Sequence, residues 1–119
     1  MESNNLIAKF MELEYAPEGS RWDDWFDIDR YRVTYGNRIP LQYDTSWDWL
    51  MPVVDKIRSI KCYDKGDVFN YQFIIHNNKV EYYADGYTKK PSKFFNGSDI
   101  ETIYKAVLEF IKEYNNGIN

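Results

Sequence analysis

The sequence has one cysteine, one histidine and no long apolar run, and each shortage excludes a class of protein. Cys62 alone can form neither an internal disulfide nor a multi-cysteine zinc site, which is typical of an intracellular protein. No segment approaches the roughly 20 apolar residues of a membrane span. The start, MESNNLIAKF, lacks the basic and apolar regions of a signal peptide. We therefore expect a cytoplasmic protein with no membrane partner.

The chain also lacks the positive charge that nucleic-acid binding requires. It has 15 Lys and Arg against 19 Asp and Glu, and its net charge of −4 has the wrong sign for neutralising phosphates. One stretch mixes tyrosines with lysines as a single-strand groove would, but a solvated loop is the favoured interpretation in an acidic chain. We expect no nucleic-acid partner. That stretch comprises Tyr82, Tyr83, Tyr87, Lys89, Lys90 and Lys93.

Catalytic and cofactor motifs are missing as well. The sequence contains no G-x-x-x-x-G-K-[ST], G-x-G-x-x-G, G-x-S-x-G or H-E-x-x-H. His76 has no nucleophile in a recognisable motif to accompany it, and a lone thiol such as Cys62 usually packs as a small apolar group. We expect no catalytic residue, no cofactor and no metal, and therefore no enzyme.

Aromatic residues are what the chain has in excess. Its 119 residues are 44% apolar, which suits one globular domain over residues 1–119. Aromatic side chains make up 18%, with eleven Tyr, seven Phe and four Trp. Such a small core does not need to bury all of them, and recognition surfaces favour Tyr and Trp. We expect some of these rings to be exposed.

The clearest structural signal is an amphipathic segment from Ser98 to Tyr114, which predicts a helix. Ser98 and Glu101 match an S-x-x-E capping box, in which each side chain bonds a backbone N–H of the first turn. The apolar stripe consists of Ile100, Ile103, Tyr104, Val107, Leu108 and Ile111.

A second amphipathic segment, from Thr45 to Ile60, predicts another helix. Thr45 or Ser46 is the expected N-cap, and Pro52 is expected to bend the helix because it removes a backbone hydrogen bond. The expected buried face consists of Trp47, Leu50, Met51, Val54, Ile57 and Ile60.

A short first helix is predicted at the start of the chain. Ser3 or Asn4 is its expected N-cap, and it should end near Glu14, before a stretch with proline and glycine. Leu6, Ile7, Phe10 and Met11 share its apolar face.

Strands are predicted between the second and third helices. Alternation predicts a strand over Val68 to Ile75, and Asn77-Asn78 then turns the chain into a strand over Lys79 to Tyr83. A strand near Lys61 to Tyr63 is expected to pair with the first of these. The segment Tyr87 to Phe95 is expected to be loop or a short edge strand, because it contains a proline.

A further hairpin is predicted earlier in the chain. Asp29 to Tyr35 alternates like a strand, and Gly36-Asn37 could turn it onto Arg38 to Tyr43. Together these elements predict an α+β fold with a small antiparallel sheet sandwiched or flanked by three helices.

Three segments, NNLIAKFM, SWDWLMPVVDKI and IETIYKAVLEFIKEYN, resemble a family of small proteins from phages, prophages and gut Bacteroidetes that is related to the phage αβα-sandwich domain family. The resemblance implies an αβα or α+β sandwich and a phage or mobile-element origin, but no activity. A phage-encoded protein would act in the host cell cytoplasm. Any member-specific function would lie in the aromatic and acidic insert from Gly19 to Asp44.

The strongest candidate site is the run WDDWFDID within that insert. Its carboxylates lack the ligand spacing of a calcium loop, so contact with a basic partner is favoured over metal binding. We therefore predict binding residues at Trp22, Asp23, Asp24 and Trp25, with Trp22 or Trp25 at least half exposed. In the alternative interpretation, both tryptophans and Phe26 fold back into the core while the aspartates face water.

Three functions remain. The first is a non-catalytic binding protein that acts on a host protein through an aromatic surface. The second is a small-molecule binder, for example one that sequesters a nucleotide-like signal, which the tyrosine excess and Arg30 would permit. The third is a minor structural or virion component.

Overall fold

The structure is a computed structural model that describes residues 2–15, 25–26, 33, 41–64, 67–83 and 93–116. The chain divides into two compact units, Met1–Gln42 and Tyr43–Asn119. One domain over residues 1–119 stays a prediction.

In the first unit, helix α1 spans Glu2–Phe10. Ser3 and Asn4 lie inside it, so the prediction that one of them caps it is wrong; the buried Asn4 side chain instead donates a hydrogen bond to the Leu41 carbonyl at 3.1 Å. Beyond the helix, Glu12 adopts a left-handed conformation with φ 64°. Its N–H bonds the Lys9 carbonyl and the Leu13 N–H bonds the Ala8 carbonyl. These two bonds form a Schellman motif, which satisfies carbonyls that the helix end leaves open.

The same unit contains a short two-stranded sheet that the sequence did not predict. Strands β1 (Glu14–Tyr15) and β2 (Trp25–Phe26) pair antiparallel, and the Val33 N–H bonds the Trp25 carbonyl at 2.7 Å. The hairpin predicted over residues 29–43 lies mostly outside the described residues. Of its described residues, Val33 lies in a bend and Tyr43 in a turn.

In the second unit, helix α2 spans Trp47–Ser59 with Ser46 at the N-cap position, although the Ser46 side chain makes no capping bond. Trp47, which was predicted to be buried, is 45% exposed at the first residue of the helix. Pro52 lies inside the helix, as expected. The buried residues are Leu50, Val53, Val54 and Ile57.

Helix α3 spans Ile100–Asn115, and its N-cap is Asp99. The Asp99 carboxylate accepts the Thr102 N–H at 2.9 Å, so the predicted capping box is wrong by one residue. Ser98 instead donates to the Asn77 carbonyl at 2.7 Å, and Glu101 forms an ion pair with Lys105 at 3.3 Å. Serine and aspartate are both common N-cap residues. Here Asp99 has that position, and the Ser98 hydroxyl is used by the Asn77 carbonyl.

The cap gives a testable expectation. Asp99→Ala should lower the unfolding temperature. Asp99→Asn should lower it less, because the amide oxygen can still accept the Thr102 N–H. The hydrogen bonds from Thr102 hold the pKa of Asp99 below its usual value, so this contribution is present above about pH 4 and is lost as the pH falls through the folded-state pKa. Thermal unfolding of both variants at pH 7 and pH 3 measures it. Equal midpoints for the two variants at pH 7 would contradict the assigned cap.

The strands of the second unit form two antiparallel sheets. Strands β3 (Lys61–Asp64) and β4 (Asp67–Asn70) make a hairpin, which confirms the predicted pairing. Strands β5 (Gln72–Ile75), β6 (Lys79–Tyr83) and β7 (Lys93–Asn96) form a second sheet in the order β5-β6-β7. The strand predicted over Val68 to Ile75 is therefore broken at Tyr71, whose N–H bonds the Ile60 carbonyl at 3.0 Å.

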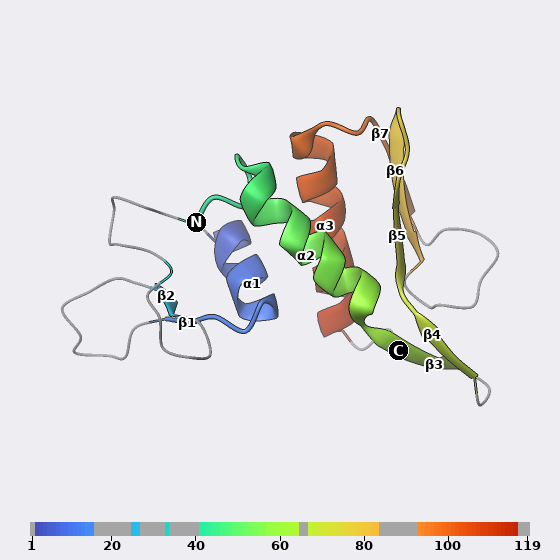
Figure 1. The fold of residues 1–119 in the computed structure, drawn as a ribbon, viewed down its shortest axis with the longest axis horizontal. Helices are drawn as coiled ribbons and strands as arrows, with labels where there is room; N and C mark the ends of the chain where they lie inside the picture. The colour runs from blue at the N-terminus through green and yellow to red at the C-terminus, as the bar shows by residue number, and fades with distance from the viewer. Residues whose placement is uncertain are drawn as a thin grey trace. The chain divides into compact units, whose positions relative to one another are not determined.

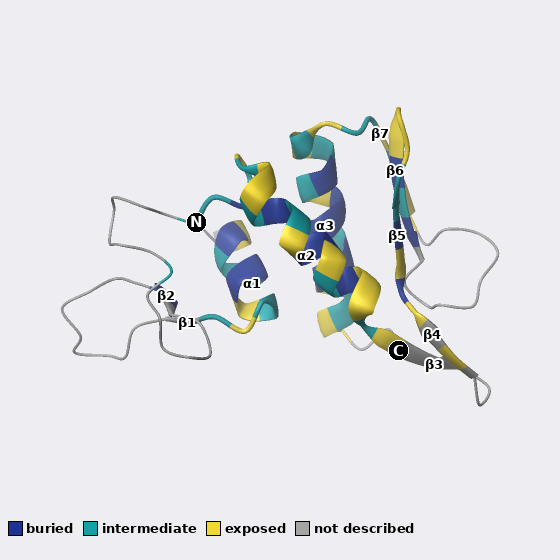
Figure 2. Ribbon diagram, viewed as in Figure 1, coloured by how far each residue is buried: buried dark blue, intermediate teal, exposed yellow. Residues whose placement is uncertain are grey.

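Helices α2 and α3 lie on the same side of the three-stranded sheet (Figure 1). Helix α2 contacts β5, and α3 contacts β6, β7 and α2. The α+β prediction, with an antiparallel sheet packed against helices, is confirmed. Helix α3 contacts both the sheet and α2, and much of its visible surface is buried (Figure 2). Its buried residues are Ile103, Ala106, Val107, Leu108, Phe110 and Ile111.

Aromatic rings fill much of the interface between α3 and the sheet. Phe110 lies edge-on to Tyr71 at 5.2 Å and to Tyr82 at 5.5 Å between ring centroids, and stacks on Tyr114 at 6.0 Å. Tyr82 also stacks between Phe73 and Phe95, at 6.3 Å from each. Tyr71, Phe73, Tyr82 and Phe110 are all buried here, so part of the aromatic content belongs to the core.

Candidate binding surface on the three-stranded sheet

The two faces of the three-stranded sheet differ in what they contact. Residues directly opposite one another in the register share a face, so Phe73, Tyr82 and Lys93 form one row. That row faces the helices, since Tyr82 contacts Phe110 on α3. The next row along the strands, Ile74, Glu81 and Phe94, therefore lies on the outer face.

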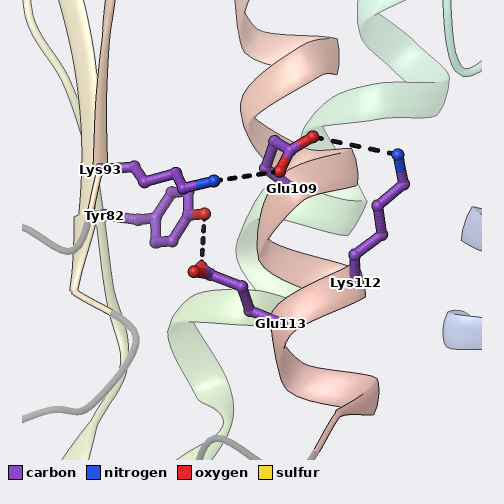
Figure 3. Close-up of polar contacts among 5 residues, drawn as sticks. All are labelled: Tyr82, Lys93, Glu109, Lys112 and Glu113. Atoms are coloured by element: carbon purple, nitrogen blue, oxygen red, sulfur yellow. Dashed lines mark hydrogen bonds and ion pairs between the residues drawn. The ribbon is translucent and has the colours of Figure 1, made fainter.

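Two polar contacts tie the inner face to α3 (Figure 3). The Tyr82 hydroxyl donates a hydrogen bond to Glu113 Oε2 at 2.6 Å. Lys93 Nζ lies 3.2 Å from Glu109 Oε2, and Lys112 Nζ lies 3.9 Å from the other oxygen of Glu109. Because Lys93 is the first residue of β7, the Glu109 contact attaches this strand to the helix.

The Tyr82 hydroxyl is suited to a structural role. Burial raises the pKa of Tyr82 far above its usual value of 10, and the hydrogen bond to the Glu113 carboxylate raises it further. The hydroxyl therefore keeps its proton at neutral pH and donates a hydrogen bond to Glu113. A hydroxyl that stays protonated cannot accept a proton as a general base. Its hydrogen bond to Glu113 instead holds β6 against α3.

The outer face carries an exposed ring beside a small charged cluster. Phe94 is 62% exposed, and the half-buried Ile74 lies in the same row. Glu81 lies between them in the row. Its Oε1 is 3.3 Å from His76 Nε2, and its Oε2 is 3.9 Å from Lys79 Nζ. The Glu81 side chain is only 14% exposed, whereas that of Lys79 is 46% exposed. Among the described residues of this face, Lys79 is therefore the more accessible member of its ion pair with Glu81.

At the β5 edge of the sheet, two backbone groups that point outward already have hydrogen-bond partners. The His76 N–H bonds the Lys79 carbonyl, which fixes the alternation of β5 so that Phe73 and Tyr71 direct their backbone groups away from β6. Arg58 Nε on α2 donates to the Phe73 carbonyl at 2.8 Å. The Tyr71 N–H is taken by the Ile60 carbonyl. A partner strand would have to displace both contacts to pair here.

The edge at β7 is open among the described residues. The Gly97 N–H bonds the Asn78 carbonyl at 2.7 Å, so the alternation directs the backbone groups of Lys93 and Phe95 toward β6. Those of Phe94 and Asn96 point away from the sheet. No described residue makes a hydrogen bond to them, and β6 is the only described strand that pairs with β7.

The predicted binding residues are placed differently. Trp25 is buried at 6% exposure in β2, so it does not supply an exposed ring, and for this residue the core interpretation holds. Trp22, Asp23 and Asp24 lie outside the described residues. Sequence reasoning missed Phe94, which it placed at the end of a loop or edge strand.

The other chemical candidates in the sequence were His76 and Cys62. His76 is exposed, and its Nε2 lies 3.3 Å from Glu81 Oε1, while the Cys62 backbone lies in β3. Within the described ranges, no group of three or more His, Cys, Asp or Glu side chains is arranged to hold a metal ion. None of the helices in those ranges combines the length and apolarity needed to cross a membrane.

Comparison of the chain with protein-family models, with curated proteins and with solved structures gave no match. The resemblance to the phage αβα-sandwich family therefore stays a prediction that rests on the three sequence segments.

Proposed function

We propose that this protein is a non-catalytic binding protein that recognises a partner protein through the outer face of the three-stranded sheet. The observation that carries the proposal is Phe94, which is 62% exposed on a strand that Lys93 and Glu109 attach to α3. An exposed ring on a fixed strand loses little conformational freedom when it is covered, which favours its use in binding.

The chemistry of the face favours a protein over a small molecule. Small ligands are usually held in concave sites that enclose most of their surface, whereas Phe94 projects from a sheet face beside charged side chains. An apolar centre with a charged rim is the usual composition of a protein interface. If the chain has the phage origin that its resemblance implies, the partner is a host protein.

The test compares two exposed apolar residues. Tagged wild-type protein, Phe94→Ser and Val68→Ser are purified from cells of the native host, and the proteins that accompany each are quantified by mass spectrometry. Val68 is a matched control because it is 53% exposed and lies on β4 in the other sheet of this unit. We expect a partner that accompanies the wild type and Val68→Ser, and that Phe94→Ser loses.

Circular dichroism and thermal unfolding show that all three proteins are folded before the comparison. Equal recovery of every accompanying protein by the wild type and Phe94→Ser would contradict binding through this face. Equal losses in both variants would mean that exposed apolar area in general, rather than the outer face, holds the partner.

A further inference from the structure

We propose that the partner binds by adding an extended strand to the open edge of β7, and that this strand carries an acidic residue two positions from an apolar one. The inference rests on the proposed function and specifies how the same face is recognised. Its basis is the combination of open backbone groups and an exposed ring on β7 with the accessible Lys79 on the neighbouring strand β6.

The backbone of β7 determines the conformation of the partner segment. The N–H and C=O groups of Phe94 and Asn96 point outward at a two-residue spacing, which the backbone of another extended chain matches. At the opposite edge, Arg58 Nε already donates to the Phe73 carbonyl. An added strand can therefore pair at β7 without displacing a contact, whereas at β5 it would have to displace this one.

The side chains beside the edge determine the chemistry of that segment. A residue opposite Phe94 lies on the outer face, so an apolar side chain there would cover the exposed ring. The residue opposite Asn96 lies on the same face, and Lys79 is across β7 in the same row. Since Lys79 is more accessible than Glu81, a carboxylate at that position is complementary in charge.

The edge fits a flexible segment better than a second copy of this chain. Strand β7 ends before Gly97, whose φ of 105° leaves the strand region, so the pairing covers only Lys93–Asn96. Two rigid copies joined by such a short strand would bury much less than the roughly 1,200 Å² of a stable interface. A flexible segment can pair with β7 and also follow the outer face toward Ile74, which a rigid copy cannot.

The test removes one outward donor without touching the pairing with β6. Asn96→Pro deletes an N–H that points away from the sheet, and proline is tolerated at such edge positions. Asn96→Ala is the matched control because it removes the same side chain and keeps the N–H. The probe is a displayed library of random nine-residue peptides, selected on the wild-type protein and then measured against each variant by fluorescence anisotropy.

We expect enriched peptides in which an apolar residue and Asp or Glu are two positions apart. Asn96→Pro should weaken their binding by about tenfold or more, while Asn96→Ala stays within about twofold of the wild type. In amide hydrogen exchange, peptide binding should newly protect Phe94 and Asn96, whereas Lys93 and Phe95 should be protected already in the free protein.

The outcomes separate the two proposals. If Phe94→Ser loses the cellular partner and Asn96→Pro keeps it, the binding face stands and strand addition is overturned. If Phe94→Ser keeps the partner, the proposed function itself fails. Strand addition is also overturned if the wild type enriches no peptides beyond those that the folded Asn96→Pro protein enriches. If analytical ultracentrifugation shows a wild-type dimer that Asn96→Pro dissociates, the strand at the β7 edge comes from a second copy of this chain, and the proposed partner segment is overturned.

Discussion

Phe110→Ala is expected to lower the free energy of unfolding by about 3 to 5 kcal/mol, because truncating a fully buried ring loses apolar burial and leaves a cavity. Phe110 is fully buried on α3 and contacts the rings of Tyr71, Tyr82 and Tyr114. These neighbours lie on the sheet and on the helix itself, so relaxation of one element alone cannot refill the space. Urea unfolding at neutral pH measures the change.

Phe94→Ala is the control for that measurement. It makes the same chemical change on the outer face of the sheet, where the ring is largely exposed. We expect its free energy of unfolding to stay within about 0.5 kcal/mol of the wild type. If the two variants were equally destabilised, the assignment of β7 residues to the inner and outer faces would be wrong.

The second large effect is expected in alkaline solution, where wild-type stability should fall steeply above pH 10. Burial raises the pKa of Tyr82 far above 10 and that of Tyr43 to about 12. Above pH 10 the unfolded chain releases these protons while the folded chain keeps them, so stability falls as the pH rises. Each tyrosine contributes fully below pH 10 and should lose about 1.4 kcal/mol per pH unit up to its folded-state pKa.

Tyr82→Phe isolates one of the two contributions. At pH 7 the variant should be less stable by about 1 kcal/mol, because it lacks the hydrogen bond to Glu113. Between pH 7 and 11 its stability should fall by about 1.4 kcal/mol less than that of the wild type, so the difference between the proteins should disappear or reverse. Urea unfolding at pH 7, 10 and 11 checks this. Parallel pH profiles would show that Tyr82 is already accessible to water.

The sequence was sufficient for the elements whose signals are local. Periodicity placed α2 and α3 to within two residues at each end, and Asn77-Asn78 located the β5–β6 turn. A single stripe could not predict the burial of Phe110, because that depends on α3 contacting two neighbours at once. The break at Tyr71 also has no local signal, since the Ile60 carbonyl that bonds its N–H lies at the end of α2.

The candidate surface was harder to predict than the fold. Sequence reasoning looked for exposed rings among acidic residues and selected Trp25, but acidic neighbours do not prevent a ring from being buried in a short sheet. Phe94 and Phe95 are adjacent and chemically identical, and alternation along β7 sends them to opposite faces. Which of them is exposed depends on the register of β7 on β6, which places Phe95 opposite the buried Val80 and against Tyr82.

The Arg58 contact with the Phe73 carbonyl determines how far strand pairing can continue. If both sheet edges were open, β5 of one molecule could pair with β7 of the next, and such head-to-tail contacts have no natural end, so they propagate into fibres. Because the Phe73 carbonyl is already occupied by Arg58, each such contact would first have to break this hydrogen bond. A single guanidinium group thus opposes head-to-tail pairing through β5 while leaving the outward groups of β7 available.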